Sequence, residues 1–193
     1  VTTNPSLMLK AGKDPREVLK EISDIFPFHA SVSAEVVGDS VEEMLEMADD
    51  YIEIGPNITI KVPLTPEGLK VCKDLSTDDV AVNVTLCFST AQAILAAKAG
   101  ATYVSPFVGR VNDQSFDGIK LIEEISDVYA THKQKTQVLA ASIRDVYQVA
   151  SCFRVGADIC TIPSKIFSGM YKHILTDQGI AKFDEDWTKL VGG

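Results

Sequence analysis

The sequence has little cysteine and histidine, and neither residue type is spaced like a set of metal ligands. The three histidines are isolated, and none of the four cysteines forms a CxxC pair; they are Cys72, Cys87, Cys152 and Cys160. Zinc sites usually draw their ligands from close pairs, so this spacing argues against a metal site. Scattered cysteines are typical of free, buried or half-buried thiols in a reducing cytoplasm.

Long apolar runs and clusters of positive charge are also missing. No run approaches the roughly 20 apolar residues of a membrane span, and the sequence shows no charged-then-apolar signal peptide. Its 18 Lys and Arg are outnumbered by 27 Asp and Glu, which gives a net charge of -9. Such an acidic surface argues against binding nucleic acid or an anionic membrane, although a few local arginines still suit a small anionic substrate.

The chain has enough apolar residues for one core. It contains 193 residues, of which 46% are hydrophobic, and no linker, repeat or low-complexity segment interrupts them. A chain of this size buries a sizeable core as one unit. We therefore predict a single domain over residues 1–193.

Strand-like and helix-like segments alternate along the chain. Residues 1–3 look like a strand end, and alternating or β-branched patterns predict strands over residues 31–37, 57–62, 80–87, 102–107, 137–142 and 158–162. Helices are predicted over residues 14–25, 40–54, 65–75, 89–99, 115–132, 144–154, 163–173 and 177–190. A capping box at Ser40 and Glu43 supports one helix start, whereas residues 4–6 (NPS) predict a turn.

This alternation predicts an α/β fold with a parallel sheet and helical cover. No glycine-rich nucleotide fingerprint follows the first strand, which argues against a Rossmann arrangement. A closed barrel needs eight strands, and the chain supplies six and a strand end. We interpret the fold as a (β/α)8 TIM barrel that lacks its first strand and helix. An extra C-terminal helix would carry Phe183 and Trp187 one turn apart.

Side chains alternate across a strand, so their parity sorts the two faces of the sheet. In residues 57–62, Ile60 and Val62 share one face with Ile58, and Lys61 shares the other with Thr59. Four more strands divide in the same way, and their polar members include Ser33, Glu35, Asn83, Thr85, Ser105 and Ser142. In a barrel these groups would converge at the C-terminal mouth, where barrel active sites lie.

Lys61 is the only positively charged residue among these polar strand residues. Burial favours a neutral amine over an ammonium group, and a neutral amine can attack a carbonyl and form a Schiff base. Glu35 on the neighbouring strand could relay protons, with Thr85 as its partner. Two alternatives stay open: a lysine that extends into solvent, and an ion pair between Glu35 and Lys61 that performs no chemistry.

A second group of residues suits an anion. Arg110 follows one predicted strand, and Ser142 and Arg144 follow another at a helix start. Two arginines, a hydroxyl and a helix N-terminus are suited to a phosphate group. The alternative is that each arginine is an ordinary surface residue. Asp113 shows no such convergence, and we expect its side chain to be solvated.

Seven segments resemble the transaldolases: VTTNPS, SAEV, IKVPLT, NVTLCFSTAQA, YVSPFVGRVND, LAASIRD and FDEDW. They occur in the family's order and cover essentially the whole chain. More narrowly, the sequence is similar to the small single-barrel subfamily that also contains the fructose-6-phosphate aldolases.

The resemblance implies a role for each motif. Lys61 matches the Schiff-base lysine, and Glu35 and Thr85 match the pair that holds the catalytic water. The residues that match donor-sugar contacts are Thr2, Asn4, Asn83 and Ser105, and those that match the phosphate site are Arg110, Ser142 and Arg144. Phe107 and Glu35 favour a transaldolase, because the fructose-6-phosphate aldolases carry tyrosine and glutamine at these positions.

The sequence departs from the family's pattern in one respect. The family's acid/base aspartate stands on the first strand, and this sequence lacks that strand. A barrel without it has two open edges. We therefore expect this chain alone to be poorly stable and catalytically weak unless a preceding segment supplies the strand.

The resemblance predicts a transaldolase of the pentose phosphate pathway. The enzyme would pass a dihydroxyacetone unit from a ketose phosphate (sedoheptulose 7-phosphate or fructose 6-phosphate) to an aldose phosphate. The lysine anchors the electron sink, so no metal or organic cofactor is needed. The alternatives are an aldolase that releases free dihydroxyacetone and a non-catalytic sugar-phosphate-binding barrel. The resemblance also implies a ring-type homo-oligomer, with contacts from the C-terminal segment.

Overall fold

A curled parallel sheet of six strands forms the centre of the structure, a computed structural model that describes residues 1–26 and 29–192. The strands lie in space in their chain order: β1 (Val32–Glu35), β2 (Ile58–Pro63), β3 (Val82–Cys87), β4 (Tyr103–Pro106), β5 (Gln137–Ala140) and β6 (Ile159–Cys160). All six predicted strands are present, most of them shorter than predicted. The prediction of an α/β fold with a parallel sheet is confirmed.

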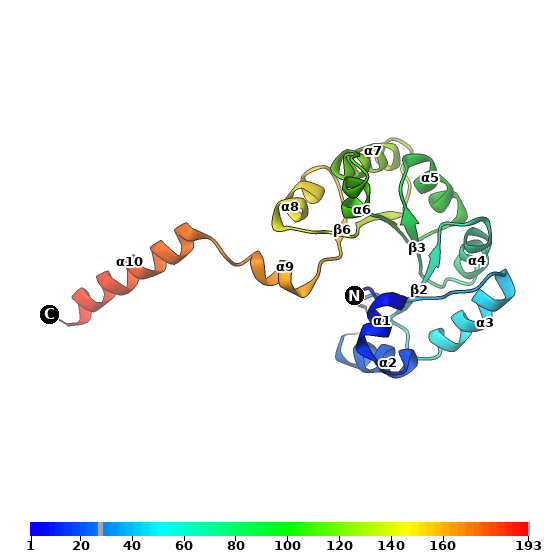
Figure 1. Cartoon of the computed structure of the whole chain (residues 1–193), viewed down its shortest axis with the longest axis horizontal. Helices are drawn as coiled ribbons and strands as arrows, with labels where there is room; N and C mark the ends of the chain where they lie inside the picture. Colours follow the sequence, from blue (N-terminus) through cyan, green and yellow to red (C-terminus); the bar gives the residue numbers. More distant parts are fainter. Residues whose placement is uncertain (27–28, 193) are drawn as a thin grey trace.

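Six of the helices form an arc around the sheet (Figure 1). They are α2 (Pro15–Ile25), α3 (Val41–Ile52), α4 (Pro66–Thr77), α5 (Thr90–Ala99), α7 (Gly118–Thr131) and α8 (Val146–Arg154). All of them except α2, which precedes β1, come after a strand in the chain. The predicted capping box of α3 is present. Ser40 Oγ accepts the N–H of Glu43, and the Glu43 carboxylate accepts the N–H of Ser40.

Two short helices differ from the prediction. Residues 4–6 were expected to form a turn, but Asn4 Oδ1 accepts the N–H of Leu7 at 2.9 Å and caps α1 (Pro5–Ala11). The prediction was wrong because the cap and proline of a seven-residue helix have the composition of a turn. Helix α6 (Val108–Asp113) was not predicted. Its N-cap residue is Phe107, whose side chain forms no capping hydrogen bond, so the sequence carries no signal for a helix start.

The sheet stays open within residues 1–26 and 29–192, since its hydrogen-bonded order runs from β1 to β6 without closing. The predicted strand end at residues 1–3 is an isolated parallel bridge between Thr2 and Ser33. Thr2 Oγ1 also lies 2.6 Å from Thr161 Oγ1, directly after β6. The structure therefore shows a curled six-stranded sheet with one bridge beside it, and the complete strand set of a (β/α)8 barrel is not present in these residues.

Alternate residues of the central strands form the apolar core. Ile60 on β2 and Val82 on β3 are fully buried, and they belong to one cluster with helix residues such as Val71 and Ile122. Burial of each such side chain contributes about 1.5–3 kcal/mol. The helices thus cover the apolar face of the sheet, and the intervening residues of each strand face the other side.

The turn between β2 and α4 requires a glycine. Thr65 Oγ1 caps α4 by accepting the N–H of Gly68 at 3.0 Å, which brings Gly68 against the end of β2. A Cβ atom on Gly68 would lie 2.0 Å from the carbonyl oxygen of Pro63. The first turn of α4 therefore packs directly on the strand that carries Lys61.

The C-terminal segment extends away from the sheet (Figure 1). It comprises α9 (Ser164–Gly169) and α10 (Ile174–Val191), and neither helix contains a buried residue. Phe183 and Trp187 are 74% and 64% exposed, so their apolar surfaces lack cover within this chain. None of the helices in the described part of the chain is both long and apolar enough to cross a membrane.

We expect Gly68→Ala to destabilise the chain by about 1–3 kcal/mol, because the added methyl group must push α4 away from Pro63. Gly179→Ala is the matched control, since a Cβ atom at Gly179 in α10 meets no atom within 4 Å. Alanine is the better helix former, so the control should be neutral or slightly stabilising. Urea unfolding of both variants measures the difference, and equal stabilities would contradict the close-packing argument.

Candidate active site

A row of polar side chains lines the face of the sheet opposite the apolar core. The strand register places Glu35 beside Lys61 and Lys61 beside Asn83 on three consecutive strands. Lys61 and Asn83 are buried, as are Thr59, Thr85 and Ser105 of the same predicted polar set. The alternation in the sequence therefore assigned these residues to the correct face.

Lys61 is held by two acceptors. Its Nζ donates to Glu35 Oε2 at 2.8 Å and to the carbonyl oxygen of Thr3 at 3.1 Å. The side chains of Lys61 and Glu35 are only 7% and 13% exposed. The alternative of a lysine that extends into solvent is therefore wrong, and the predicted ion pair with Glu35 is present.

This geometry places a proton acceptor next to a primary amine. A lysine must lose a proton before its Nζ can attack a carbonyl, and the Glu35 carboxylate lies within direct hydrogen-bonding distance of it. The charge of either partner alone would be costly at this level of burial. The contact therefore provides a direct path for a proton from the Lys61 amine to the Glu35 carboxylate.

The hydroxyl oxygen of Thr85 is a buried polar atom of the site that is available for a hydrogen bond. Its Oγ1 is buried and has no hydrogen-bond partner within residues 1–26 and 29–192. Its register partner is Pro63, two residues beyond Lys61 on β2. Buried hydroxyl groups are almost always hydrogen-bonded, so this oxygen is suited to a polar group of a ligand or to a water molecule.

A hydrogen-bonded chain connects three buried polar residues beside Lys61. Ser105 Oγ donates to Asn83 Oδ1 at 2.7 Å, and Asn83 Nδ2 donates to Ser33 Oγ at 3.1 Å. All three residues are at most 2% exposed. Both ends of the Asn83 amide therefore have partners that hold the side chain in place. The structure thus brings together three members of the predicted polar set: Ser33, Asn83 and Ser105.

The predicted anion-binding residues come from two segments that pack together. The N–H groups of Val108 and Gly109 donate to the carbonyl oxygens of Ala141 and Ser142 at 3.0 and 3.1 Å. A Cβ atom on Gly109 would lie 2.2 Å from the Ser142 carbonyl oxygen. Glycine at this position therefore permits the segment that carries Arg110 to approach the segment that carries Ser142 and Arg144.

Arg110 and Arg144 line one cavity of about 610 Å³, and Ser142 is not among the residues that line it. Phe107 lies beneath one of these cations, with its ring centroid 4.8 Å from the Arg110 guanidinium carbon. The Phe88 ring packs against Phe107 in a tilted arrangement, with the ring centroids 5.6 Å apart. The aromatic pair therefore supports the side of the cavity that carries Arg110.

Asp113 was expected to be solvated; its side chain does reach solvent, and it also has an ion-pair partner. Its carboxylate accepts from the guanidinium of Arg144 at 2.7 Å, and both side chains are about half exposed. Asp113 lines the same cavity as the two arginines. The pair joins residues 31 positions apart, so no local sequence pattern pointed to it.

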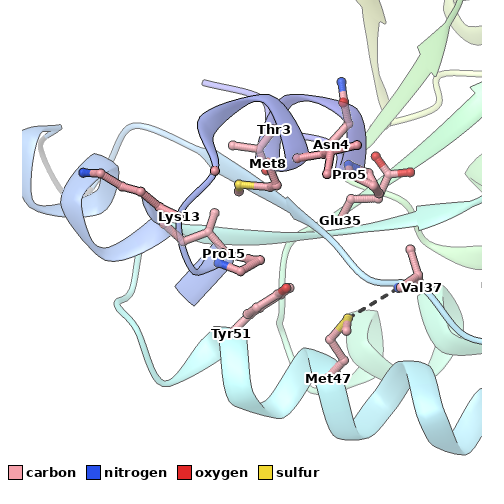
Figure 2. Close-up of a pocket in the computed structure, with 13 residues that line it drawn as sticks. Thr3, Asn4, Pro5, Met8, Lys13, Pro15, Glu35, Val37, Met47 and Tyr51 are labelled. Atoms are coloured by element: carbon pink, nitrogen blue, oxygen red, sulfur yellow. Dashed lines mark hydrogen bonds between the residues drawn. The ribbon is translucent and has the colours of Figure 1, made fainter. Parts of the chain in front are cut away.

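Asn4 and Thr2 line separate cavities. Asn4 lies with Thr3 and Glu35 at a cavity of about 350 Å³, and Figure 2 shows Glu35 and Asn4 at one end of it and Lys13 at the other. Thr2 lines a different cavity of about 500 Å³ with Ser33 and Thr161. Only Asn4 of these two predicted sugar contacts therefore shares a cavity with Glu35.

The cysteines behave as predicted from their spacing, as free thiols. Cys72, Cys87 and Cys152 are buried and Cys160 is half-buried. Burial raises the pKa of Cys72 and of Cys87 to about 12. A hydrogen bond from the Cys152 thiol lowers the pKa of Cys160. Within residues 1–26 and 29–192, no three His, Cys, Asp or Glu side chains form a group that could hold a metal ion.

Comparison with known proteins extends the resemblance to the whole chain. Residues 1–193 match the family described as Transaldolase/Fructose-6-phosphate aldolase. The chain is 52% identical to the probable transaldolase of Paracoccus denitrificans, over 98% of this chain and 86% of the relative. It is 52% identical to the probable transaldolase of Cereibacter sphaeroides over 98% and 85%, and 46% identical to that of Caulobacter vibrioides over 97% and 85%.

We expect Asp113→Asn to tighten the binding of inorganic phosphate by about threefold to fivefold, because the carboxylate competes with an anion for Arg144. Isothermal titration at low ionic strength measures the affinity. Asp184→Asn on the exposed helix α10 changes the net charge equally and should leave the affinity unchanged. Weaker phosphate binding by Asp113→Asn would contradict the competition.

Proposed function

The chain belongs to the transaldolase/fructose-6-phosphate aldolase family, and on that premise we propose that it transfers a dihydroxyacetone unit through a Schiff base on Lys61. One observation carries the proposal: a buried primary amine lies 2.8 Å from a carboxylate on the polar face of the sheet. Sugar phosphates are the substrates, with fructose 6-phosphate or sedoheptulose 7-phosphate as donor and an aldose phosphate as acceptor.

The reaction begins when Lys61 passes a proton to Glu35 and its neutral Nζ attacks the C2 carbonyl of the ketose. Loss of water, with the proton returned from Glu35, gives an iminium ion. The C3–C4 bond then breaks and its electron pair moves into the iminium group to form an enamine. The C4 hydroxyl gives its proton to the Glu35 carboxylate, and the aldose phosphate leaves as an aldehyde. The enamine attacks the aldehyde carbon of the acceptor, whose oxygen takes that proton from Glu35, and water releases the new ketose from Lys61.

Two groups of residues would hold the donor during these steps. Asn83 lies beside Lys61 in the strand register and Ser105 donates to Asn83, so both can bind hydroxyl groups of the donor. Asn4 shares a cavity with Glu35. Thr2 belongs to the same proposed set, although its hydroxyl pairs with Thr161 in the free chain. The uncommitted Thr85 Oγ1 supports a role with Glu35 in holding the hydrolytic water.

Arg110 and Arg144 are proposed to bind the substrate phosphate, together with the hydroxyl of Ser142. Their shared cavity and fixed backbone neighbours support this assignment. Two guanidinium groups can form charge-assisted hydrogen bonds with one phosphate, which a single surface lysine cannot match in geometry. The Phe107 ring beneath Arg110 lacks the hydroxyl expected of the aldolases and therefore favours transfer over release of free dihydroxyacetone.

Borohydride reduction with fructose 6-phosphate should attach one dihydroxyacetone-derived group to Lys61, detected by peptide mass spectrometry. Lys61→Arg keeps the charge but cannot form the imine, so it serves as the control. Absence of a covalent adduct would favour the non-catalytic binding alternative and sink the Schiff-base proposal. Turnover that needs no aldose phosphate acceptor would identify the aldolase alternative instead.

The partner and the compartment are proposed on separate grounds. Helix α10 has no buried residue and exposes Phe183, Trp187 and Leu190, which supports its docking on another copy of the chain in a ring-type homo-oligomer.

Four cysteines without a disulfide support a reducing, cytoplasmic location.

We expect Phe183→Glu combined with Trp187→Glu to lower the oligomeric mass measured by light scattering, because the substitutions place charge in the proposed contact. Lys182→Glu lies on the same helix and should leave the mass unchanged. An unchanged mass for the double variant would contradict the role of α10. Lys61 labelling with borohydride checks that each variant keeps a folded site.

A further inference from the structure

Ser33 contacts both sides of the candidate active site, through its backbone on one side and its hydroxyl on the other. It lies on β1, two residues before Glu35, and is 1% exposed. Neither the motif resemblance nor the comparisons assign it a role, and the mechanism above does not use it. Its contacts nevertheless lead to two groups of the candidate site, the Asn83 amide directly and the Lys61 amine through Thr3.

The backbone of Ser33 fixes the acceptor that holds Lys61. Its carbonyl oxygen accepts from the N–H of Thr3 at 3.0 Å and from Thr3 Oγ1 at 2.7 Å. Its N–H donates to the carbonyl oxygen of Val1 at 2.9 Å. These bonds anchor residues 1–3 along β1, and the Thr3 carbonyl oxygen then accepts from Lys61 Nζ at 3.1 Å.

The hydroxyl of Ser33 fixes the orientation of Asn83. The amide of Asn83 is fully buried, with Nδ2 bound to Ser33 Oγ at 3.1 Å and Oδ1 bound to Ser105 Oγ at 2.7 Å. Each serine hydroxyl binds one polar atom of the amide, so the two serines together hold the amide in place at both ends.

We propose that Ser33 is a positioning residue that holds the Asn83 amide in the orientation that binds the donor sugar next to Lys61. The inference rests on the proposed function, since Asn83 is taken to contact the donor. Without the Ser33 hydroxyl, one N–H of Asn83 is left buried without its acceptor, so the amide turns or shifts. The backbone bonds to Thr3 do not depend on the Ser33 side chain, so the support of Lys61 is kept.

The test measures the fructose 6-phosphate concentration at which borohydride trapping on Lys61 is half-maximal, by intact-mass spectrometry. Ser33→Ala should raise this concentration by about tenfold while the maximal extent of trapping stays the same. Ser33→Thr keeps the hydroxyl and should restore most of the loss. Ser31→Ala is the matched control, because Ser31 pairs with Thr59 Oγ1 at 2.7 Å on the same face of the chain and should change the value little.

A second measurement separates positioning from general destabilisation. In an Asn83→Ala chain, adding Ser33→Ala should change the half-saturating concentration by less than about twofold, because the residue through which Ser33 acts is gone. An equal loss in both backgrounds, or an equal loss in Ser31→Ala, would overturn the inference. If the unsubstituted chain forms no adduct, the proposed function fails; if it forms one and Ser33→Ala traps normally, only the role of Ser33 fails.

Discussion

The buried ion pair between Lys61 and Glu35 is the interaction on which the rest of the site depends. Two charges can remain at this depth only because they contact each other and because Thr3 supplies a second acceptor to the amine. The polar row around them needs a sheet whose opposite face is fully apolar, so that helices can cover it. The fold therefore separates its two tasks by strand face: stability on one side and chemistry on the other.

Period-two alternation and helix caps made much of this arrangement predictable. Residues such as Lys61 and Asn83 alternate with apolar neighbours, so parity alone assigns them to one face, and parallel pairing then brings them together. The contacts that were not predicted leave no local pattern in the sequence. The Thr3 acceptor is a backbone carbonyl, and the Asp113–Arg144 pair depends on how α6 packs against the segment after β5. Short helices such as α1 offer too few turns for a periodic pattern.

Close contacts between backbone segments determine the positions of Lys61 and of the proposed phosphate-binding residues. Gly68 lets α4 pack on the end of β2, and Gly109 lets the Arg110 segment pack on the Ser142 segment. In both cases a methyl group would collide with a carbonyl oxygen rather than with a movable side chain. The candidate site residues on these segments are therefore positioned in part by two glycines that take no part in the chemistry themselves.

The strand order has a consequence for how the molecule opens. Since each strand pairs with its neighbours in the chain, every βα unit is supported by the unit before it and the unit after it, as in a linear repeat protein. In such an array local unfolding spreads from the ends, and β6 is the weaker end because its two residues are only half-buried. Fraying can therefore proceed from β6 through β5 and loosen the Arg144 side of the site, while β2 and β3 keep Lys61 and Asn83 in register.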